Sequence, residues 1–501
     1  MREITFLKGM FMKKFMATTI LASTIVTGQL FAQEMNFDKE VFMAKMENTP
    51  HKIRLLNSGL ASLEERLQMI EKAQKTIDIE YFIYNADKSG KIFTQALIKK
   101  AKEGVKIRML LDTFMIKGLI TPFHIHELKQ HGIEVKYFNN SAKLSLVKGM
   151  YRNHRKLLIV DGKAVVTGGR NIGDEYFDMR EDYNFLDREI YVEGDIVAKI
   201  EKTFEVFWNS EASVTLARPE KPNKEDFKYR DNEGNSSFNY ESDLYYWNKS
   251  YKTAIEFIGQ EDTELYDKVR SKGKALLEAS YEGTCNNITF ASEYPILSKK
   301  NRPHRILKKY LFDQVENAKE KVLFDSPYFI VDEDSKKSLD VALSKKLEVQ
   351  LLTNGLNSTD AIYVYDVFKS IIKDWIGKGL LAFTYKGDLP NNYEILDESV
   401  SKARFGVHAK TFVFDNKDVV IGTYNFDPRS ANYNSEMVIA CNDNAELAHE
   451  VTKDVELRMQ DSFKLDSEEQ VDETAFYKVG FLKRIGYGVL KLPSHLFDYL
   501  L

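Results

Sequence analysis

The chain has 501 residues, enough for two or more domains, and its content of 43% hydrophobic and 12% aromatic residues is that of a globular protein with a substantial core. A formal net charge of −4 gives no electrostatic reason to expect nucleic acid as a partner, because nucleic-acid-binding proteins carry basic patches. The two cysteines, Cys285 and Cys441, have no metal-ligand spacing, and the sequence leaves open whether they pair.

The N-terminal residues have the pattern of a secretory signal. Lys13 and Lys14 precede a short apolar run, residues 15–26, and residues 28–32 end in a plausible cleavage site. The apolar run is shorter than the roughly 20 residues that a membrane-spanning helix needs. We therefore expect residues 1–32 to be a signal peptide, with an uncleaved membrane tether as the alternative. The protein is then expected to be exported from a bacterial cytoplasm and to be periplasmic or membrane-associated.

The two halves of the chain have similar predicted elements. In the first half the apolar runs predict a strand, a helix and a strand, at residues 77–83, 96–102 and 105–111. In the second half the same order is expected at residues 322–330, 335–346 and 348–352. The triplets that start at Tyr81 and Tyr328, both Tyr-Phe-Ile, match without a gap. Strands that alternate with helices predict an α/β layered fold, and the duplication predicts two similar domains around a pseudo-twofold axis with one active site at their interface.

The predicted domains are an N-terminal one over residues 33–216 and a C-terminal one over residues 281–465. Residues 217–280 between them are expected to be a linker or insertion, since the segment begins with a stretch rich in charge, Asn, Pro and Tyr. Residues 466–501 are expected to form an amphipathic tail. Its apolar and basic residues at helical spacing fit either a helix at a lipid surface or a helix packed on the domain.

The most informative pattern is a duplicated His-x-Lys-x-x-x-x-Asp. The copies consist of His154, Lys156 and Asp161 in the first half and of His408, Lys410 and Asp415 in the second. Each copy is followed by a small-residue turn that ends on an asparagine, Asn171 or Asn425. Apolar runs after each lysine predict strands, and side chains two apart on a strand share a face, so each histidine is expected to project beside its lysine.

Two histidine–lysine pairs suit the chemistry of a phosphodiester. The lysines can neutralise phosphate oxygens, and the two asparagines can donate amide hydrogen bonds to the same oxygens. One imidazole can attack phosphorus while the other protonates the leaving alkoxide. This arrangement requires no metal and no cofactor. Asp161 and Asp415 stay open between a catalytic role and local hydrogen bonding in a turn.

Two downstream acids are candidates to orient the imidazoles through their second ring nitrogens. Asp187 is expected to serve His154, and Glu436 is expected to serve His408. Glu189 is a rival to Asp187, because it lies on the same strand face.

These residues resemble the phospholipase D superfamily, whose defining feature is this duplicated motif. Stretches that begin at Gly168, Leu352 and Gly422 are similar to the bacterial cardiolipin synthases, particularly the C-type members. The resemblance implies a phosphohistidine intermediate, with His154 as the nucleophile and His408 as the general acid and later base, although the reverse assignment is also compatible with the sequence. Thr423 departs from the pattern, in which a serine is usual.

The leading hypothesis is a phosphatidyltransferase of the cardiolipin synthase type, with phosphatidylglycerol or a similar phospholipid as substrate and peripheral contact with the membrane. A phospholipase D that releases phosphatidic acid would use the same residues, because only the acceptor differs. A secreted nuclease of the superfamily would be expected to carry more positive charge. A non-catalytic membrane-binding protein is disfavoured by the completeness of both motifs.

Overall fold

The structure is a computed structural model that describes residues 39–113, 120–139, 150–225, 236–259, 262–295, 305–481 and 483–488. The fold described below is that of the compact unit formed from residue 40 onward. The predicted signal peptide and residues 489–501 of the predicted tail lie outside the described residues. No helix in the described part of the chain is both long enough and apolar enough to cross a membrane.

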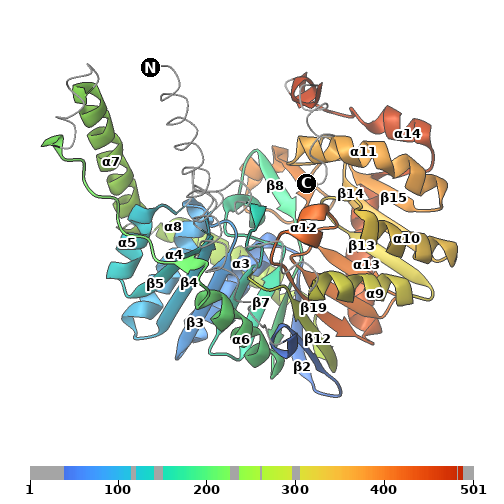
Figure 1. Cartoon of the computed structure of the whole chain (residues 1–501), viewed down its shortest axis with the longest axis horizontal. Coiled ribbons are helices and arrows are strands. Elements are labelled where there is room, and N and C mark those ends of the chain that lie inside the picture. The colour runs from blue at the N-terminus through green and yellow to red at the C-terminus, as the bar shows by residue number, and fades with distance from the viewer. Residues whose placement is uncertain are drawn as a thin grey trace, which may run out of the picture. The chain divides into compact units, whose positions relative to one another are not determined.

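The first half is built on a nine-stranded mixed sheet, on the left in Figure 1. In sheet order its strands are β10 (Ser213–Val214), β5 (Ile133–Phe138), β4 (Lys106–Asp112), β3 (Thr76–Tyr81), β6 (Leu157–Val160), β7 (Ala164–Gly168), β9 (Glu189–Glu193), β2 (His51–Leu56) and β11 (Glu282–Cys285). The helices of this half and of the connecting segment are α3 (Gly59–Lys72), α4 (Lys88–Lys102), α5 (Pro122–Gln130), α6 (Ile196–Trp208), α7 (Ser236–Gly259) and α8 (Thr263–Glu278), with a short 3-10 helix, η3 (Asp174–Tyr176). The core packs α3 and α4 against the sheet and α8 against α3.

The second half repeats this plan. In sheet order its strands are β1 (Met43–Met46), β12 (Asn287–Ser292), β19 (Met437–Asn442), β18 (Asp418–Gly422), β17 (Thr411–Phe414), β13 (Lys321–Asp325), β14 (Glu348–Asn354), β15 (Leu381–Tyr385) and β20 (Ser462–Leu465). Its helices are α9 (Ile306–Asn317), α10 (Glu333–Ser344), α11 (Ile362–Gly377), α12 (Pro428–Asn432), α13 (Ala445–Gln460) and α14 (Glu468–Thr474), with a 3-10 helix, η6 (Glu398–Lys402). The predicted α/β fold of two similar domains is thereby confirmed.

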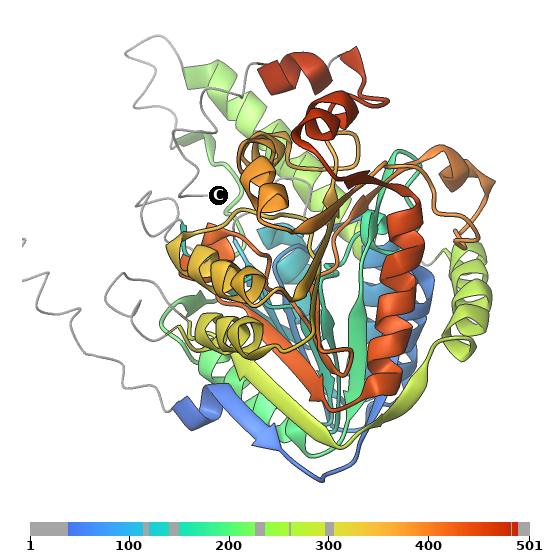
Figure 2. The same ribbon diagram turned by 90° about the vertical axis from the view of Figure 1, so that its right-hand side faces the viewer.

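The two sheets exchange strands, so the predicted domain boundaries do not coincide with them. The short helix α2 (Lys39–Phe42) leads into β1, which pairs antiparallel with β12 of the second sheet, where Figure 2 shows it in blue beside the yellow strand. Strand β11, assigned from the sequence to the second domain, pairs with β2 of the first sheet. Helix α6 packs on β3 and β9 of its own sheet and on β1 and β12 of the other. Each half therefore carries a strand contributed from the other half's part of the sequence.

The connecting segment and the tail are also more integrated than predicted. Residues 236–278 contain the helices α7 and α8, and both supply residues to the first core: Phe257 and Ile258 from α7, Val269 and Leu277 from α8. In the tail, α14 and the residues after it supply Val471, Ala475, Val479 and Tyr487 to the second core. The described part of the tail therefore packs on the second core, while Phe481 and Ile485 stay exposed.

The internal repeat has a different register from the one suggested by the matching Tyr-Phe-Ile triplets. Ile77 of β3 pairs with Val160, and the equivalent pair in the second half is Val322 with Phe414. The N-caps of the following helices, Asp87 for α4 and Asp332 for α10, keep the same spacing. Tyr81 is therefore equivalent to Ser326, and the triplet match was wrong by two residues. A shift of two preserves the strand face, so the apolar pattern did not expose the error.

Candidate active site

The two histidines lie at the boundary between the halves, where each backbone is hydrogen-bonded to the other half. Strands β8 (Tyr183–Leu186) and β16 (Arg404–Val407) pair in parallel and end beside each other. The backbone N–H of His408 donates to the carbonyl of Leu186 at 2.8 Å, and that of His154 donates to the carbonyl of Ser435 at 2.9 Å. The pseudo-twofold axis relates these two contacts.

The residue after each of these carbonyls binds the histidine ring. Glu436 Oε2 lies 2.9 Å from Nδ1 of His154, and Asp187 Oδ2 lies 2.5 Å from Nδ1 of His408. Asp187 and Glu436 were correctly singled out as histidine partners, but the predicted pairing was wrong: each acid serves the histidine of the opposite half. The cause is the interlocked backbone, which brings the start of β9 and β19 to the other half's motif.

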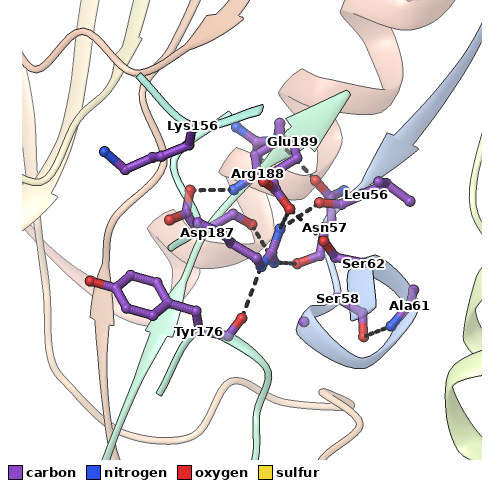
Figure 3. Close-up of polar contacts among 12 residues, drawn as sticks. Leu56, Asn57, Ser58, Ala61, Ser62, Lys156, Tyr176, Asp187, Arg188 and Glu189 are labelled. Carbon is purple, nitrogen blue, oxygen red and sulfur yellow. Dashed lines mark hydrogen bonds and ion pairs between the residues drawn. The ribbon is translucent and has the colours of Figure 1, made fainter. Parts of the chain in front are cut away.

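Glu189, the rival to Asp187, is committed elsewhere. Its carboxylate is bound by the Arg66 guanidinium, with one contact of 2.6 Å, and also accepts from the hydroxyl of Ser62. Figure 3 shows Ser62 beside Glu189 and the backbone N–H of Arg188 donating to Asp187, a bond of 2.8 Å. Glu189 is thus part of a buried ion pair in the first core and does not contact a motif histidine.

The two carboxylates are held by different sets of neighbours. Glu436 accepts hydrogen bonds from Thr423 at 2.5 Å, Ser430 at 2.9 Å and Asn434 at 3.1 Å. Thr423, the departure from the family pattern, therefore still supplies the hydroxyl that a serine would supply. In the first half the equivalent turn position is Gly169, where a Cβ would lie 2.1 Å from a carboxylate oxygen of Asp187. Glycine is required there because the carboxylate approaches the backbone.

Burial dominates the protonation of the rings. It lowers the pKa of His154 to about 4 and that of His408 to about 3, although Glu436 and Asp187 act in the opposite direction. For these acids burial alone would raise the pKa, but the neighbouring histidines hold the pKa of both below the ordinary value. Near neutral pH both carboxylates are then ionised and both imidazoles neutral. Each Nδ1–H donates to its carboxylate, which leaves each Nε2 lone pair available as a base or nucleophile.

The lysines lie beside the histidines as the strand alternation predicted. Lys156 Nζ donates to the carbonyl of His154 at 2.7 Å, and Lys410 makes the equivalent bond to the carbonyl of His408. Both lysines are almost completely buried. Burial lowers the pKa of Lys156 to about 7 and that of Lys410 to about 8. When protonated, the buried ammonium groups of Lys156 and Lys410 are weakly solvated, so an anion can bind them without displacing a full hydration shell.

The two asparagines are buried near the motifs but differ in their contacts. Oδ1 of Asn171 accepts from the backbone N–H of Ile83 at 3.0 Å. Oδ1 of Asn425 is buried without a hydrogen-bond partner among the described residues. Their proposed role as phosphate ligands stays a prediction.

Asp161 and Asp415, left open between a catalytic and a structural role, are engaged in backbone hydrogen bonds and not placed for catalysis, so the catalytic alternative was wrong. Asp161 accepts from the backbone N–H groups of residues 74–76 at 2.7 to 2.9 Å, and Asp415 accepts from those of residues 319–321 at 2.8 to 3.2 Å. Each aspartate follows the strand that begins after its motif lysine and lies at the end of that strand remote from the histidine. Extended chain rises roughly 3.3 Å per residue, so the aspartate is about 20 Å from the histidine of its own motif. They anchor the loops that precede β3 and β13.

Three aromatic rings around the histidines were not singled out from the sequence. Phe82 meets the ring of His154 with centroids 5.1 Å apart, while Phe185 and Tyr176 lie 4.5 and 5.4 Å from that of His408. Of the three, only Phe82 belongs to the Tyr-Phe-Ile triplet described above, and its position in the sequence gave no indication that it contacts a histidine. Among the described residues, no group of three or more His, Cys, Asp or Glu side chains is arranged to hold a metal ion.

This fold and its paired histidine–lysine motifs define a duplicated α/β protein with a single composite site. The family model for the phospholipase D-like domain of cardiolipin synthase matches residues 67–208 and 311–459, and the chain belongs to this family.

Relatives of known sequence match over most of the chain. An uncharacterized protein of Helicobacter pylori strain J99 is 31% identical over 88% of this chain and 84% of its own length. Cardiolipin synthase C of Escherichia coli K12 is 28% identical over 76% of this chain and 79% of its own length. Cardiolipin synthase 1 of Bacillus anthracis is 27% identical, with 88% and 72% covered. The crystal structure of a phosphatidylserine synthase from Haemophilus influenzae superposes with a TM-score of 0.61 at 12% identity, covering 91% of this chain and 98% of the other, and shares the fold.

Proposed function

We propose that the chain is a phosphatidyltransferase of the cardiolipin synthase type, which moves a phosphatidyl group from one phospholipid to the hydroxyl of another. The observation that carries the proposal is the composite site itself: two buried imidazoles, each oriented by a carboxylate of the opposite half and each beside a buried lysine. The family membership and the cardiolipin synthases among the relatives support the choice of substrate.

The proposed reaction has two displacements at phosphorus. In the first, His154 Nε2 attacks, a phosphorus–nitrogen bond forms, the bond to the leaving head-group oxygen breaks, and His408 protonates that oxygen. In the second, His408 takes the proton of the acceptor hydroxyl, whose oxygen displaces His154. The exchanged assignment is chemically equivalent, because the pseudo-twofold axis relates the two histidines.

His408 has to gain its proton together with the substrate. Burial lowers its pKa to about 3 in the free protein, so the imidazole is neutral near pH 7. An anionic phosphodiester placed between the rings favours the charged imidazolium and raises this pKa. Lys156 and Lys410 stabilise the charge that develops on the phosphate oxygens.

The experiment that tests the proposal is mass spectrometry of the lipid products. Purified protein is mixed with phosphatidylglycerol vesicles, with His408→Ala as the control. We expect cardiolipin and glycerol from the native protein and neither from the variant. Phosphatidic acid alone would instead establish a phospholipase D, which the same residues support chemically. No product from any phospholipid would refute both.

We further propose that the protein contacts a lipid surface peripherally. Phe481 and Ile485 of the tail are 76% and 49% exposed, and Tyr245 and Tyr246 on α7 are 60% and 62% exposed. Exposed aromatic and aliphatic side chains of this kind are typical of membrane-interface contacts. Substituting Phe481 and Ile485 by Asp is expected to reduce vesicle co-sedimentation more than turnover of a short-chain soluble substrate. Equal loss of both would refute the contact.

Export to a periplasmic or membrane-associated location is likewise a proposal. It is supported by the basic and apolar N-terminal sequence and by a disulfide between Cys285 and Cys441, a bond that persists in oxidising compartments. A fusion of residues 1–40 to alkaline phosphatase, which is active only after export, tests it. An inactive fusion would contradict export.

A further inference from the structure

The loop between β14 and α11 is fixed against the strand that leads to His408. Asn354 brackets Val407 with two hydrogen bonds, in which its Oδ1 accepts from the Val407 N–H and its Nδ2 donates to the Val407 carbonyl, both at 2.8 Å. The Ser358 carbonyl accepts from the hydroxyl of Tyr183 at 2.6 Å. A Cβ on Gly406 would lie 2.4 Å from the same carbonyl, so the loop and the strand are in close approach. The loop therefore has a defined position beside the active site.

Asp360 ends this loop with an exposed carboxylate. The hydroxyl of Tyr328 lies 3.0 Å from both of its oxygens. No lysine, arginine or histidine among the described residues lies within ion-pair distance of it. The side chain reaches solvent, but the surrounding protein removes part of its hydration, and this raises the pKa of the carboxyl. The hydrogen bond from Tyr328 lowers the same pKa by a smaller amount. Unlike Asp187 and Glu436, this carboxylate is not used by a histidine and keeps free lone pairs.

The loop that carries Asp360 is hydrogen-bonded to Val407, the residue before His408, and to Tyr183 on β8. Burial lowers the pKa of Lys410, and the negative charges nearby raise it; among these, Asp360 has the largest effect after Asp187. It also acts on Tyr176, whose ring packs against that of His408. The rings of Phe185 and Tyr183, with centroids 5.1 Å apart, follow one another from His408 towards the loop. The loop that carries Asp360 therefore lies on the His408 side of the active site.

A carboxylate at this position repels the phosphate that the lysines attract, so its ligand has to be a hydrogen-bond donor. The acceptor of the reaction is a hydroxyl. A polyol can present one hydroxyl to the base and a second one to Asp360, whereas water and monohydric alcohols have no second hydroxyl. Binding at two points lowers the entropic cost of orienting the nucleophile.

We propose that Asp360, oriented by Tyr328, binds a second hydroxyl of the acceptor and thereby selects a glycerol-type head group over water and simple alcohols. This inference rests on the proposed phosphatidyltransferase function and names a specificity-determining residue for it. Tyr328 is a positioning residue, since it acts through the carboxylate.

The test measures acceptor preference. Native protein, Asp360→Asn, Asp360→Glu and Tyr328→Phe are mixed with phosphatidylglycerol vesicles and, in separate reactions, deuterated glycerol, 1-propanol or ethanolamine, and the phosphatidyl products are quantified. Asp374→Asn, at an exposed position on α11, is the matched control. We expect the ratio of glycerol to propanol transfer to fall about tenfold or more in Asp360→Asn, through a higher KM for glycerol, because a site that hydrogen-bonds a substrate hydroxyl discriminates strongly by it. Asp360→Glu should recover part of the ratio, and Tyr328→Phe should lower it less.

The outcomes separate the two proposals. An unchanged ratio in Asp360→Asn, in a native protein that forms phosphatidyl products, overturns the inference and leaves the proposed function standing. Selective loss of ethanolamine transfer also overturns it, in favour of a site for an ammonium group. Absence of all phosphatidyl products and of phosphatidic acid from the native protein overturns both proposals together.

Discussion

Glu436, from the second half of the chain, lies with Oε2 2.9 Å from Nδ1 of His154, in the first half. Its pseudo-symmetric counterpart, Asp187, makes the reciprocal contact to His408. Neither half contains a histidine together with its own carboxylate, so the site exists only when both halves are folded and interlocked. This reciprocal arrangement gives the two imidazoles the same tautomer and leaves both Nε2 atoms without a proton, as the proposed reaction requires.

Replacing Glu436 by Gln is expected to lower kcat by about 10²- to 10⁴-fold, because the carboxylate fixes the tautomer that keeps Nε2 of His154 free. A carboxamide can donate to Nδ1 and move the proton to Nε2. The measurement is phosphatidyl transfer at neutral pH. Glu193→Gln, at an exposed position at the end of β9, is the matched control and should retain native turnover. A kcat of Glu436→Gln within a few-fold of native would contradict the orienting role.

Asp161→Ala and Asp415→Ala should act on stability and not on chemistry. Each carboxylate accepts three backbone N–H groups at a strand end remote from the histidines, so its loss is expected to cost about 1–3 kcal/mol in the free energy of unfolding. Urea unfolding measures this loss, and kcat of the folded fraction should stay near native. For Asp161 the hydrogen bonds hold the pKa below its ordinary value, although burial raises it. Its stabilisation is therefore present above about pH 4 and is lost on acidification through the lowered pKa. A fall in kcat as large as that of His154→Ala would restore a catalytic role.

The sequence was sufficient for the repeat, the α/β class and the neighbourhood of each histidine and lysine, because strand alternation and motif spacing are local properties. It was insufficient for the partner of each histidine. Asp187 and Glu436 were recognised as acids on nearby strands, but their crossed pairing depends on β8 and β16 meeting across the halves, which no local pattern encodes. The sequence left Asp161 open between catalysis and hydrogen bonding in its own turn, and it did not reveal the actual partners, which are backbone groups that precede a distant strand.

The dependence of kcat/KM on pH above neutrality should reflect the deprotonation of the two buried lysines, Lys156 and Lys410. Burial lowers the pKa of Lys156 to about 7 and that of Lys410 to about 8, and each group loses its positive charge above its pKa. We expect kcat/KM to fall in two steps across this range, because phosphate binding needs both charges. Arginine stays charged, so Lys156→Arg should keep only the step near pH 8, and Lys410→Arg only the step near pH 7. The thermal transition of each variant is the folding control. Identical high-pH profiles in the native protein and both variants would exclude the lysines as the source.

The disulfide should stabilise the interlocked halves as one cooperative unit. Cys285 belongs to β11 in the first sheet and Cys441 to β19 in the second, with Cα atoms 5.8 Å apart and a sequence separation of 156. Closing so long a loop is expected to contribute about 2–4 kcal/mol to the free energy of unfolding, because the bond restricts the unfolded chain. Cys285→Ala with Cys441→Ala should therefore lower the urea midpoint of unfolding. A reductant should shift the midpoint of the native protein and leave that of the double variant unchanged. Because each half supplies a carboxylate to the other's histidine, loss of activity in urea should coincide with loss of structure in both proteins. Two results would contradict this coupling. One is a urea midpoint of the native protein that a reductant does not change, and the other is a loss of activity at urea concentrations well below those that unfold the protein.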